Sequence, residues 1–568
     1  MTSLAAGKES RAKSGASILI RLGLVCRTRL FTRLMIVFVT VCYCFALVKY
    51  GFGRSLWADE VWVANSVTAP SLSKMFYYTW LQTSPPLFLL AVRGFVAVFG
   101  IANAVWRIIP ALMGVLSAAL MAVVLRRVLS RLYALAAWTL FVLSPTALLN
   151  SVSLKQYSSE LAAATAVLLA SLGYFRRPTL LRFWLLVATI GIALLLAYPV
   201  TFLLPGIFVC VCLSPILAAS DPSISTLSWF TSFLRGLTLA VAAASEFLGE
   251  YVFFISRNVS ADLRSFWEQN HQRGFITVVF YSCVQLLHLL ALPGRLLTSK
   301  GVGALAGILL LAGFVLAAVK FRNGQRKWLV IQILCGTPCL LVVIASLFSW
   351  YPSTARTCLF LLPYVALIVM ADVQQTSDFI LQRWTRCWLT SVFDIALVGL
   401  TLAIAVTATK ANYLRSLDQP PEDLNSAVSY LNEHVQPNDF LWIHPSVEEG
   451  FKFYKQVVGW KGQTAEVGHT GWPCCPRGVV ALRGRGTEAA VRSDVTQGIP
   501  VGVWRKIWYF YTTRKAHWDF VGLDESQVTR NVLLERGCFE TTRALFLGVG
   551  ISSFDCDAPL AERRSSKP

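Results

Sequence analysis

Long apolar stretches recur along this chain, each close to the length that a helix needs to cross a lipid bilayer. The hydrocarbon core of a bilayer is about 30 Å thick, and an α-helix crosses it in about 20 apolar residues. Unpaired backbone groups are costly in lipid, so such stretches adopt helices. The sequence therefore predicts an α-helical polytopic membrane protein of about 11 transmembrane helices. The expected spans are 34–50, 108–125, 132–149, 158–175, 181–199, 201–219, 233–256, 302–320, 328–349, 357–372 and 389–408.

The composition supports a membrane protein and argues against a nucleic-acid partner. Hydrophobic residues make up 55% of the chain and charged residues only 14%, whereas soluble proteins carry about 25% charged residues. The formal net charge is +21, but the basic residues cluster in short loops between apolar stretches, as the positive-inside rule predicts. The basic N-terminus, residues 1–33, precedes a stretch of spanning length and has no small-residue cleavage site, so we do not expect a cleavable signal.

The basic loops also predict the orientation of the chain. Loops 126–131, 176–182, 320–327 and 383–386 should lie in the cytoplasm with the N-terminus. Parity then requires that the two further apolar stretches do not cross. The stretch 87–100 is short, contains Arg93 and suits an interfacial or re-entrant helix, whereas 275–292 is long enough to span. The segments expected outside the plasma (inner) membrane are 51–107, 150–157, 257–301, 350–356 and all residues after 410.

The chain divides into a membrane domain, residues 34–408 with its first outer loop 51–107, and a polar tail, residues 409–568. The tail alternates helical and strand-like patterns, and its length suffices for its own core. We expect a small extracytoplasmic α/β domain. Its expected helices are 422–434, 448–454 and 524–536, and its expected strands are 439–444, 501–512 and 544–554.

Polar motifs gather in the predicted outer segments. The first outer loop contains W-A-D-E and then S-P-P-L-F-L-L, and later segments contain K-Q-Y-S-S-E, L-R-S-F-W-E-Q-N and Y-P-S-T-A-R followed by L-L-P. This predicts that carboxylates and cations meet at one membrane surface. The motifs begin at residues 57, 84, 155, 263 and 351.

In this order, the first three motifs and the last one resemble those of the GT-C glycosyltransferases, in particular the protein O-mannosyltransferase and aminoarabinose-transferase group. The resemblance covers residues 35–370, and the α/β tail is similar to the outer domain of bacterial members. It implies a GT-C membrane fold and a hexosyl- or pentosyltransferase that moves a sugar from a polyprenyl phosphate by one inverting displacement. Many relatives have Arg-Pro-Tyr where this chain has Lys155-Gln156-Tyr157, and His-Pro-Pro where it has Ser84-Pro85-Pro86, which leaves donor and acceptor open.

The chemistry of such a transfer suggests roles for the polar residues. Asp59 suits a general base, and Glu60 would orient the acceptor. Alternatively, the two acids cap a helix that begins at Val61. Arg356 and Lys155 would bind the donor phosphate, the first as a bidentate fork and the second as a point charge. The other candidate donor-binding residues are Tyr157 and Arg93, and the possible substrate loop contains Trp267 and Glu268.

The sequence also allows other interpretations of these residues and of the function. Arg356 could extend toward lipid head groups, and Arg93 could anchor the chain in the interface. No protein-built metal site is expected, although a divalent ion shared by Asp59 and the phosphate is conceivable. A transporter or flippase of lipid-linked saccharides and a non-catalytic scaffold are alternative functions. The acceptor could be a lipid, a glycan or a protein.

The tail also contains cysteines and tryptophans whose roles the sequence leaves undecided. Cys538 could pair with Cys556, or either with the Cys474 and Cys475 pair. Four tryptophans of the tail could pack in its core or stack on a sugar, and Asn258 begins a glycosylation sequon that matters only in a eukaryotic source. The tryptophans are Trp442, Trp472, Trp504 and Trp508.

Overall fold

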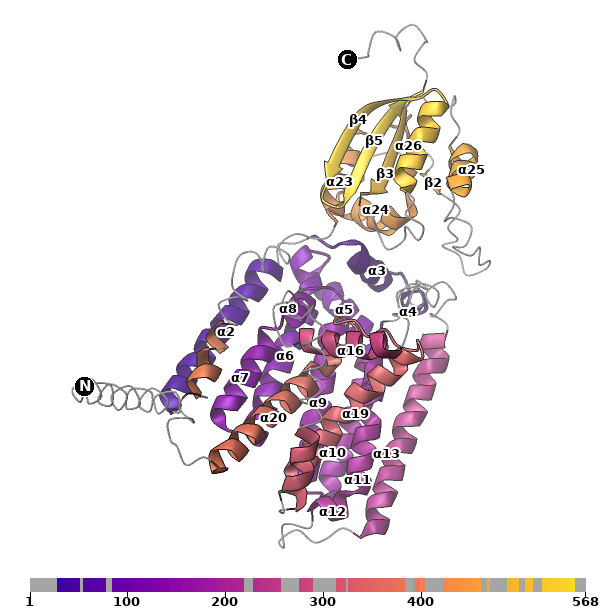
Figure 1. Ribbon diagram of the computed structural model, residues 1–568. Coiled ribbons are helices and arrows are strands. Elements are labelled where there is room, and N and C mark those ends of the chain that lie inside the picture. The colour runs from indigo at the N-terminus through magenta and orange to yellow at the C-terminus, as the bar shows by residue number, and fades with distance from the viewer. Residues whose placement is uncertain are drawn as a thin grey trace, which may run out of the picture.

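The structure is a computed structural model and has two parts, a helical bundle and a smaller sheet domain at one end of it (Figure 1). Neither the expected substrate loop with Trp267 and Glu268 nor Cys474 and Cys475 lies within the described residues. The structure describes residues 28–51, 55–77, 84–218, 228–256, 275–289, 313–322, 325–383, 392, 394–399, 401–403, 422–460, 467–469, 488–499, 506–513 and 524–556.

Among the described residues, six helices are long and apolar enough to cross a membrane, and a bent pair would make a seventh. At a rise of 1.5 Å per residue, the longest continuous α-helix, α6, measures about 39 Å, more than the hydrocarbon thickness. The helices involved are α2 (Arg29–Gly51), α6 (Asn103–Val128), α9 (Tyr157–Arg176), α13 (Trp229–Glu250) with the π-helical turn η2 (Tyr251–Ile255), α19 (Lys327–Leu347), and η3 (Leu359–Leu361) with α20 (Leu362–Arg383).

The structure does not confirm the expected count of about 11 spans, and prolines explain part of the difference. The expected span 132–149 is the bent pair, because α7 (Arg131–Val142) ends before Pro145 and α8 (Pro145–Ser151) continues at 53° to it. Proline lacks the backbone donor that an uninterrupted helix requires. About half of each of the expected spans 302–320 and 389–408 lies outside the described residues. The expected spans 181–199 and 201–219 became shorter helices, α10 (Leu180–Leu196), η1 (Tyr198–Leu203), α11 (Leu204–Cys212) and α12 (Ser214–Ala218).

Four short helices lie at the end of the bundle that faces the sheet domain (Figure 1). Helix α5 has 14 residues, which is about 21 Å and too short to cross the hydrocarbon core unaided. This agrees with the expectation that 87–100 is not a span. The four are α3 (Ala58–Val67), α4 (Leu72–Phe76), α5 (Pro86–Phe99) and α16 (Phe275–His288).

The sheet domain contains the alternating helices and strands expected of the tail. The sheet has the order β2-β1-β3-β5-β4, with β1 parallel to β2 and β3, and β5 antiparallel to β3 and β4. The expected strand 544–554 is in fact the hairpin of β4 and β5. The elements are α23 (Leu424–His434), β1 (Phe440–Ile443), α24 (Pro445–Val457), β2 (Val467–His469), α25 (Glu488–Gly498), β3 (Lys506–Thr512), α26 (Glu525–Glu535), β4 (Phe539–Phe546) and β5 (Val549–Asp555).

The two faces of this sheet pack against different partners, because successive strand residues point to opposite sides. Leu441 and Ile443 of β1 join an apolar core with α23, α24, α3 and α5. Phe440 and Trp442 pack on the other side, in the core with α25 and α26. One face of the sheet domain therefore shares its core with the short helices above the bundle.

The structure answers two questions about the tail that the sequence left undecided. Cys538 and Cys556 form a disulfide that joins the start of β4 to the end of β5, which is one of the pairings the sequence left open. Trp442 and Trp508 are buried at 1% and 3% exposure, so both are core residues and not a sugar-stacking surface. Trp472 and Trp504 lie outside the described residues.

Candidate active site

Asp59 lies in the first turn of α3, the short helix between the bundle and the sheet domain. The helix begins at Ala58, three residues before the start at Val61 that the sequence suggested. Arg356 Nη1 donates to Asp59 Oδ2 at 2.9 Å, and the two side chains are 41% and 38% exposed respectively. The tertiary structure thus brings together two predicted site residues from distant parts of the chain and leaves both accessible to a ligand.

Arg356 also contacts the first residue of α9. Its guanidinium carbon lies 5.7 Å from the centroid of the Tyr157 ring, within the range of a cation–π interaction. The neighbouring Tyr157 oxygen, together with the Asp59 carboxylate, raises the pKa of Arg356 above its usual value. Arg356 is therefore a permanent cation, held between an aromatic face and a carboxylate.

Lys155 completes the charged cluster from the loop between α8 and α9. Burial lowers the pKa of its ammonium, the Asp59 carboxylate opposes this shift, and the Arg356 cation adds to it. Lys155 as a whole is half-buried. The next residue, Gln156, accepts a hydrogen bond from Ser84 Oγ at 3.2 Å, so the two motifs that contain these residues meet in space.

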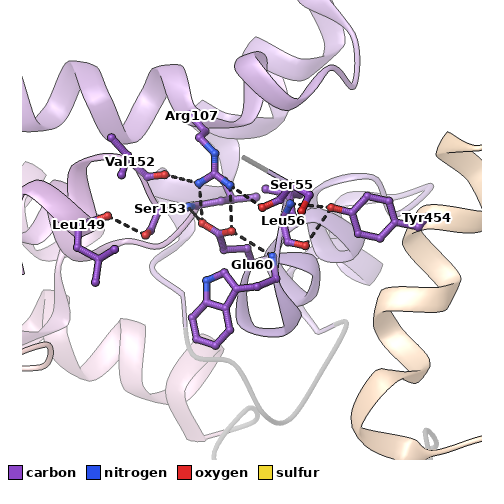
Figure 2. Close-up of polar contacts among 10 residues, drawn as sticks. Ser55, Leu56, Glu60, Arg107, Leu149, Val152, Ser153 and Tyr454 are labelled. Carbon is purple, nitrogen blue, oxygen red and sulfur yellow. Dashed lines mark hydrogen bonds and ion pairs between the residues drawn. The ribbon is translucent and has the colours of Figure 1, made fainter. Parts of the chain in front are cut away.

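Glu60 occupies a different environment from its neighbour Asp59. Its side chain is 0% exposed and forms an ion pair with the equally buried Arg107, with Nη1 to Oε1 at 2.7 Å and Nη2 to Oε2 at 3.1 Å (Figure 2). Glu60 Oε2 also accepts from the Trp57 backbone N–H at 3.2 Å. Because these oxygens are enclosed and engaged, the structure does not support the expectation that Glu60 orients an acceptor.

The Glu60–Arg107 pair joins three segments of the chain (Figure 2). Glu60 Oε1 accepts from the Leu154 backbone N–H at 2.8 Å, immediately before Lys155. Arg107 donates to the Val152 carbonyl and, through Nη2, to the Ser55 carbonyl at 3.2 Å. The pair therefore fixes α3, α6 and the Lys155 loop relative to one another, and with them Asp59 and Lys155.

Sequence reasoning did not single out Arg107. The signal was present, because Arg107 is a charged residue inside the apolar helix α6 and a charge in such a position requires a partner. The sequence could not identify that partner, which lies 47 residues earlier in the chain.

Arg93 differs from its predicted role. Its Nη1 donates to the Val67 carbonyl at 3.2 Å and to the Ala69 carbonyl at 2.8 Å, at the C-terminal end of α3. Carbonyls at that end of a helix lack intrahelical partners, and arginine commonly satisfies them. These contacts make Arg93 a cap of α3, and its predicted role in binding a phosphate stays a prediction.

The cluster of Asp59, Arg356 and Lys155 offers a defined chemistry. An accessible carboxylate can accept a proton, and two adjacent cations can bind a phosphate as negative charge develops on it. Among the residues that the structure describes, no group of three or more His, Cys, Asp and Glu side chains is placed to hold a metal ion.

The bundle and the sheet domain together form a fold that solved structures of known membrane transferases share. The resemblance inferred from the motifs is thereby confirmed at the level of the fold. The particular solved structures that share it over nearly the whole chain are those of ArnT, an aminoarabinose transferase, from Cupriavidus metallidurans.

The likeness to ArnT is distant in sequence. In its complex with undecaprenyl phosphate, ArnT is 13% identical with a TM-score of 0.51, over 92% of this chain and 98% of its own. The apo form is 14% identical with the same TM-score and coverage. The oligosaccharyltransferase of Archaeoglobus fulgidus aligns with a TM-score of 0.47 and 13% identity, over 93% of this chain and 75% of its own. No protein-family model and no curated protein sequence matches the chain.

Proposed function

We propose that this chain transfers a sugar from a polyprenyl phosphate donor to an acceptor at the outer face of the membrane, with Asp59 as the general base. The observation that carries the proposal is the contact of the accessible Asp59 carboxylate with Arg356, with Lys155 beside them. A proton acceptor and two phosphate-binding cations are the groups that such a transfer requires.

The reaction uses these groups in one displacement. The acceptor hydroxyl or amine loses its proton to Asp59 as it attacks the anomeric carbon. The bond from that carbon to the phosphate oxygen breaks, and the electron pair leaves on the phosphate, where Arg356 and Lys155 stabilise the charge. A single displacement inverts the anomeric configuration.

The ion pair of Asp59 and Arg356 must open for this reaction. As drawn in the structure, Arg356 neutralises the base. A donor phosphate competes for the guanidinium, because a guanidinium binds phosphate bidentately, and this frees the Asp59 carboxylate. Tyr157, which lies under Arg356, is placed to donate a hydrogen bond to a phosphate or sugar oxygen.

Glu60 and Arg107 have a supporting role in this proposal. Their buried pair anchors the residues next to Asp59 and Lys155, so we reassign Glu60 from acceptor contact to positioning. Buried partners of this kind hold catalytic groups in productive geometry.

Two observations support an outer-face site. The basic loops of the sequence favour the cytoplasm, and the segments that contain the site residues lie on the opposite side of the membrane. The sheet domain contains the disulfide of Cys538 and Cys556, and disulfides persist in oxidising compartments outside the cytoplasm. The ArnT fold adds support for the donor class, since one ArnT structure contains undecaprenyl phosphate.

The test compares envelope glycans and lipids by mass spectrometry in cells that lack the chain and in cells that express it or its Asp59→Asn variant. We expect a sugar modification that requires the chain, at a rate lowered about 10²- to 10⁴-fold by Asp59→Asn. The control is Asp524→Asn, because Asp524 caps α26 and asparagine caps equally well. A scaffold tolerates Asp59→Asn, and identical glycans in all cells contradict the proposal.

A further inference from the structure

The sheet domain packs directly on the helix that holds Asp59. Val61 and Ala64 of α3 share one apolar core with Val447 and Phe451 of α24. All four side chains are at most 4% exposed. In Figure 1, α24 is the helix of the sheet domain that lies nearest to α3. Apolar packing of this kind holds the two parts together but does not by itself fix a side chain to within a fraction of an ångström.

Tyr454 of α24 adds a directional contact just before α3 begins. Its hydroxyl donates to the Leu56 carbonyl at 2.9 Å and accepts from the Leu56 backbone N–H at 2.6 Å (Figure 2). Tyr454 is 0% exposed, and its burial raises the pKa of the phenol. The hydroxyl thus stays protonated at neutral pH and holds both polar backbone groups of one residue, three positions before Asp59.

Two further residues of the sheet domain hold α3. Glu422 Oε2 accepts from the Ala58 backbone N–H at 3.2 Å, one of the donors that a helix N-terminus leaves without an intrahelical partner. Toward the other end of α3, Asn65 Nδ2 donates to the Glu449 carboxylate at 2.7 Å. The sheet domain therefore forms hydrogen bonds to α3 and its preceding residues before, at and after the turn that contains Asp59.

We propose that Tyr454 and Glu422 are positioning residues that set the place of the Asp59 carboxylate, so that the sheet domain is a structural part of the active site. This inference rests on the proposed function of Asp59. Catalytic groups tolerate little displacement, since a shift of about 1 Å can lower a rate about 10²-fold. Asp59 follows Leu56 and Ala58 within one turn, so motion of those backbone groups moves its carboxylate.

The test compares Tyr454→Phe with Tyr511→Phe in the full-length chain. Tyr511 is a matched control, because it is buried in the same domain and its hydroxyl has no hydrogen-bond partner among the described residues. We expect Tyr454→Phe to lower the rate of the sugar modification about tenfold, the effect of a net hydrogen bond of ordinary strength. Binding of undecaprenyl phosphate to the purified chain should not change. Hydrogen exchange at the Leu56 amide should become faster.

Glu422 provides the rescue experiment. Glutamine retains an oxygen that can accept from Ala58, so Glu422→Gln should retain most of the rate that Glu422→Ala loses. If Tyr454→Phe matches Tyr511→Phe in rate, the positioning role is wrong, whether or not exchange at Leu56 changes. If the unmodified chain itself yields no sugar modification, the proposed function is wrong, which is a separate result.

Discussion

The Arg356 guanidinium and the Asp59 carboxylate meet at 2.9 Å across 297 residues of chain, and both side chains remain more than a third exposed. A second carboxylate, Glu60, follows directly in the sequence and meets Arg107 at 2.7 Å without any exposed surface. Two adjacent acids thus form two ion pairs in opposite environments, one open to solvent and one enclosed. Because solvent screens the exposed pair and not the enclosed one, mutation should affect the stability of the protein much less at Arg356 than at Glu60.

Removal of Arg356 should weaken donor binding and leave stability nearly unchanged. An exposed ion pair contributes about 1 kcal/mol or less, so Arg356→Ala should barely shift the unfolding midpoint. Loss of a charge-assisted hydrogen bond of about 1.5–3 kcal/mol should weaken the binding of undecaprenyl phosphate about 10- to 150-fold. Calorimetric titration measures the affinity. Arg492→Ala, at the exposed pair with Glu535, is the control, and equal affinity for both variants would contradict the role of Arg356.

Glu60→Gln should instead destabilise the protein. The substitution leaves the Arg107 cation enclosed without its countercharge, which typically costs about 3–5 kcal/mol. Thermal unfolding of the detergent-solubilised chain measures the change. Pairing Glu60→Gln with Arg107→Met removes both charges and should recover part of the loss. A loss below about 1 kcal/mol for Glu60→Gln would show that the pair does not hold α3, α6 and the Lys155 loop together.

The pKa of Lys155 predicts opposite trends in binding and stability at alkaline pH. Burial lowers this pKa from its ordinary value of 10.5, so between the lowered value and 10.5 the folded chain has lost a proton that the unfolded chain retains. The unfolded state binds more protons there, and the contribution of Lys155 to stability rises with pH. The neutral amine no longer attracts phosphate, so affinity for undecaprenyl phosphate falls in the same window.

The variant Lys155→Arg tests whether deprotonation of Lys155 causes the alkaline loss of affinity. Arginine stays charged throughout the range, so the variant should lose the alkaline decline in affinity. Binding of undecaprenyl phosphate is measured over a series of alkaline buffers with the unmodified chain and the variant. An identical decline in both would mean that a group other than Lys155 titrates.

Reduction of the disulfide should destabilise the sheet domain. Cys538 and Cys556 are 18 residues apart, and closing a loop of this size contributes about 3 kcal/mol in the chain-entropy model. Unfolding of the full chain is followed by tryptophan fluorescence with and without reductant. A variant with serine at both positions should unfold like the reduced chain and show no response to reductant, and a reductant effect in that variant would contradict the assignment.

Much of the architecture follows from local pattern. Apolar length indicated the helices of the bundle, and short, mostly apolar runs indicated β1 and β3 of the sheet domain. The prolines that shorten or bend spans near Pro145 and Pro199 were visible in the sequence, but how far each one interrupts a helix depends on neighbouring helices that can satisfy the freed backbone groups. The expected number of spans is not confirmed, for this reason and because about half of each of two expected spans lies outside the described residues.

By itself, the sequence determined that the chain is a helical membrane protein with an α/β tail, and it predicted that Asp59, Lys155, Tyr157 and Arg356 meet at one membrane surface. Only the tertiary structure decided which acid is accessible, that Arg107 neutralises Glu60, that Arg93 caps α3 and that Tyr454 holds Leu56. The physical reason is that apolar length and flanking basic residues, which direct membrane insertion, are local features of the sequence. Burial and polar contacts depend on residues that lie between 24 and 398 positions apart in the chain and meet only after the helices pack.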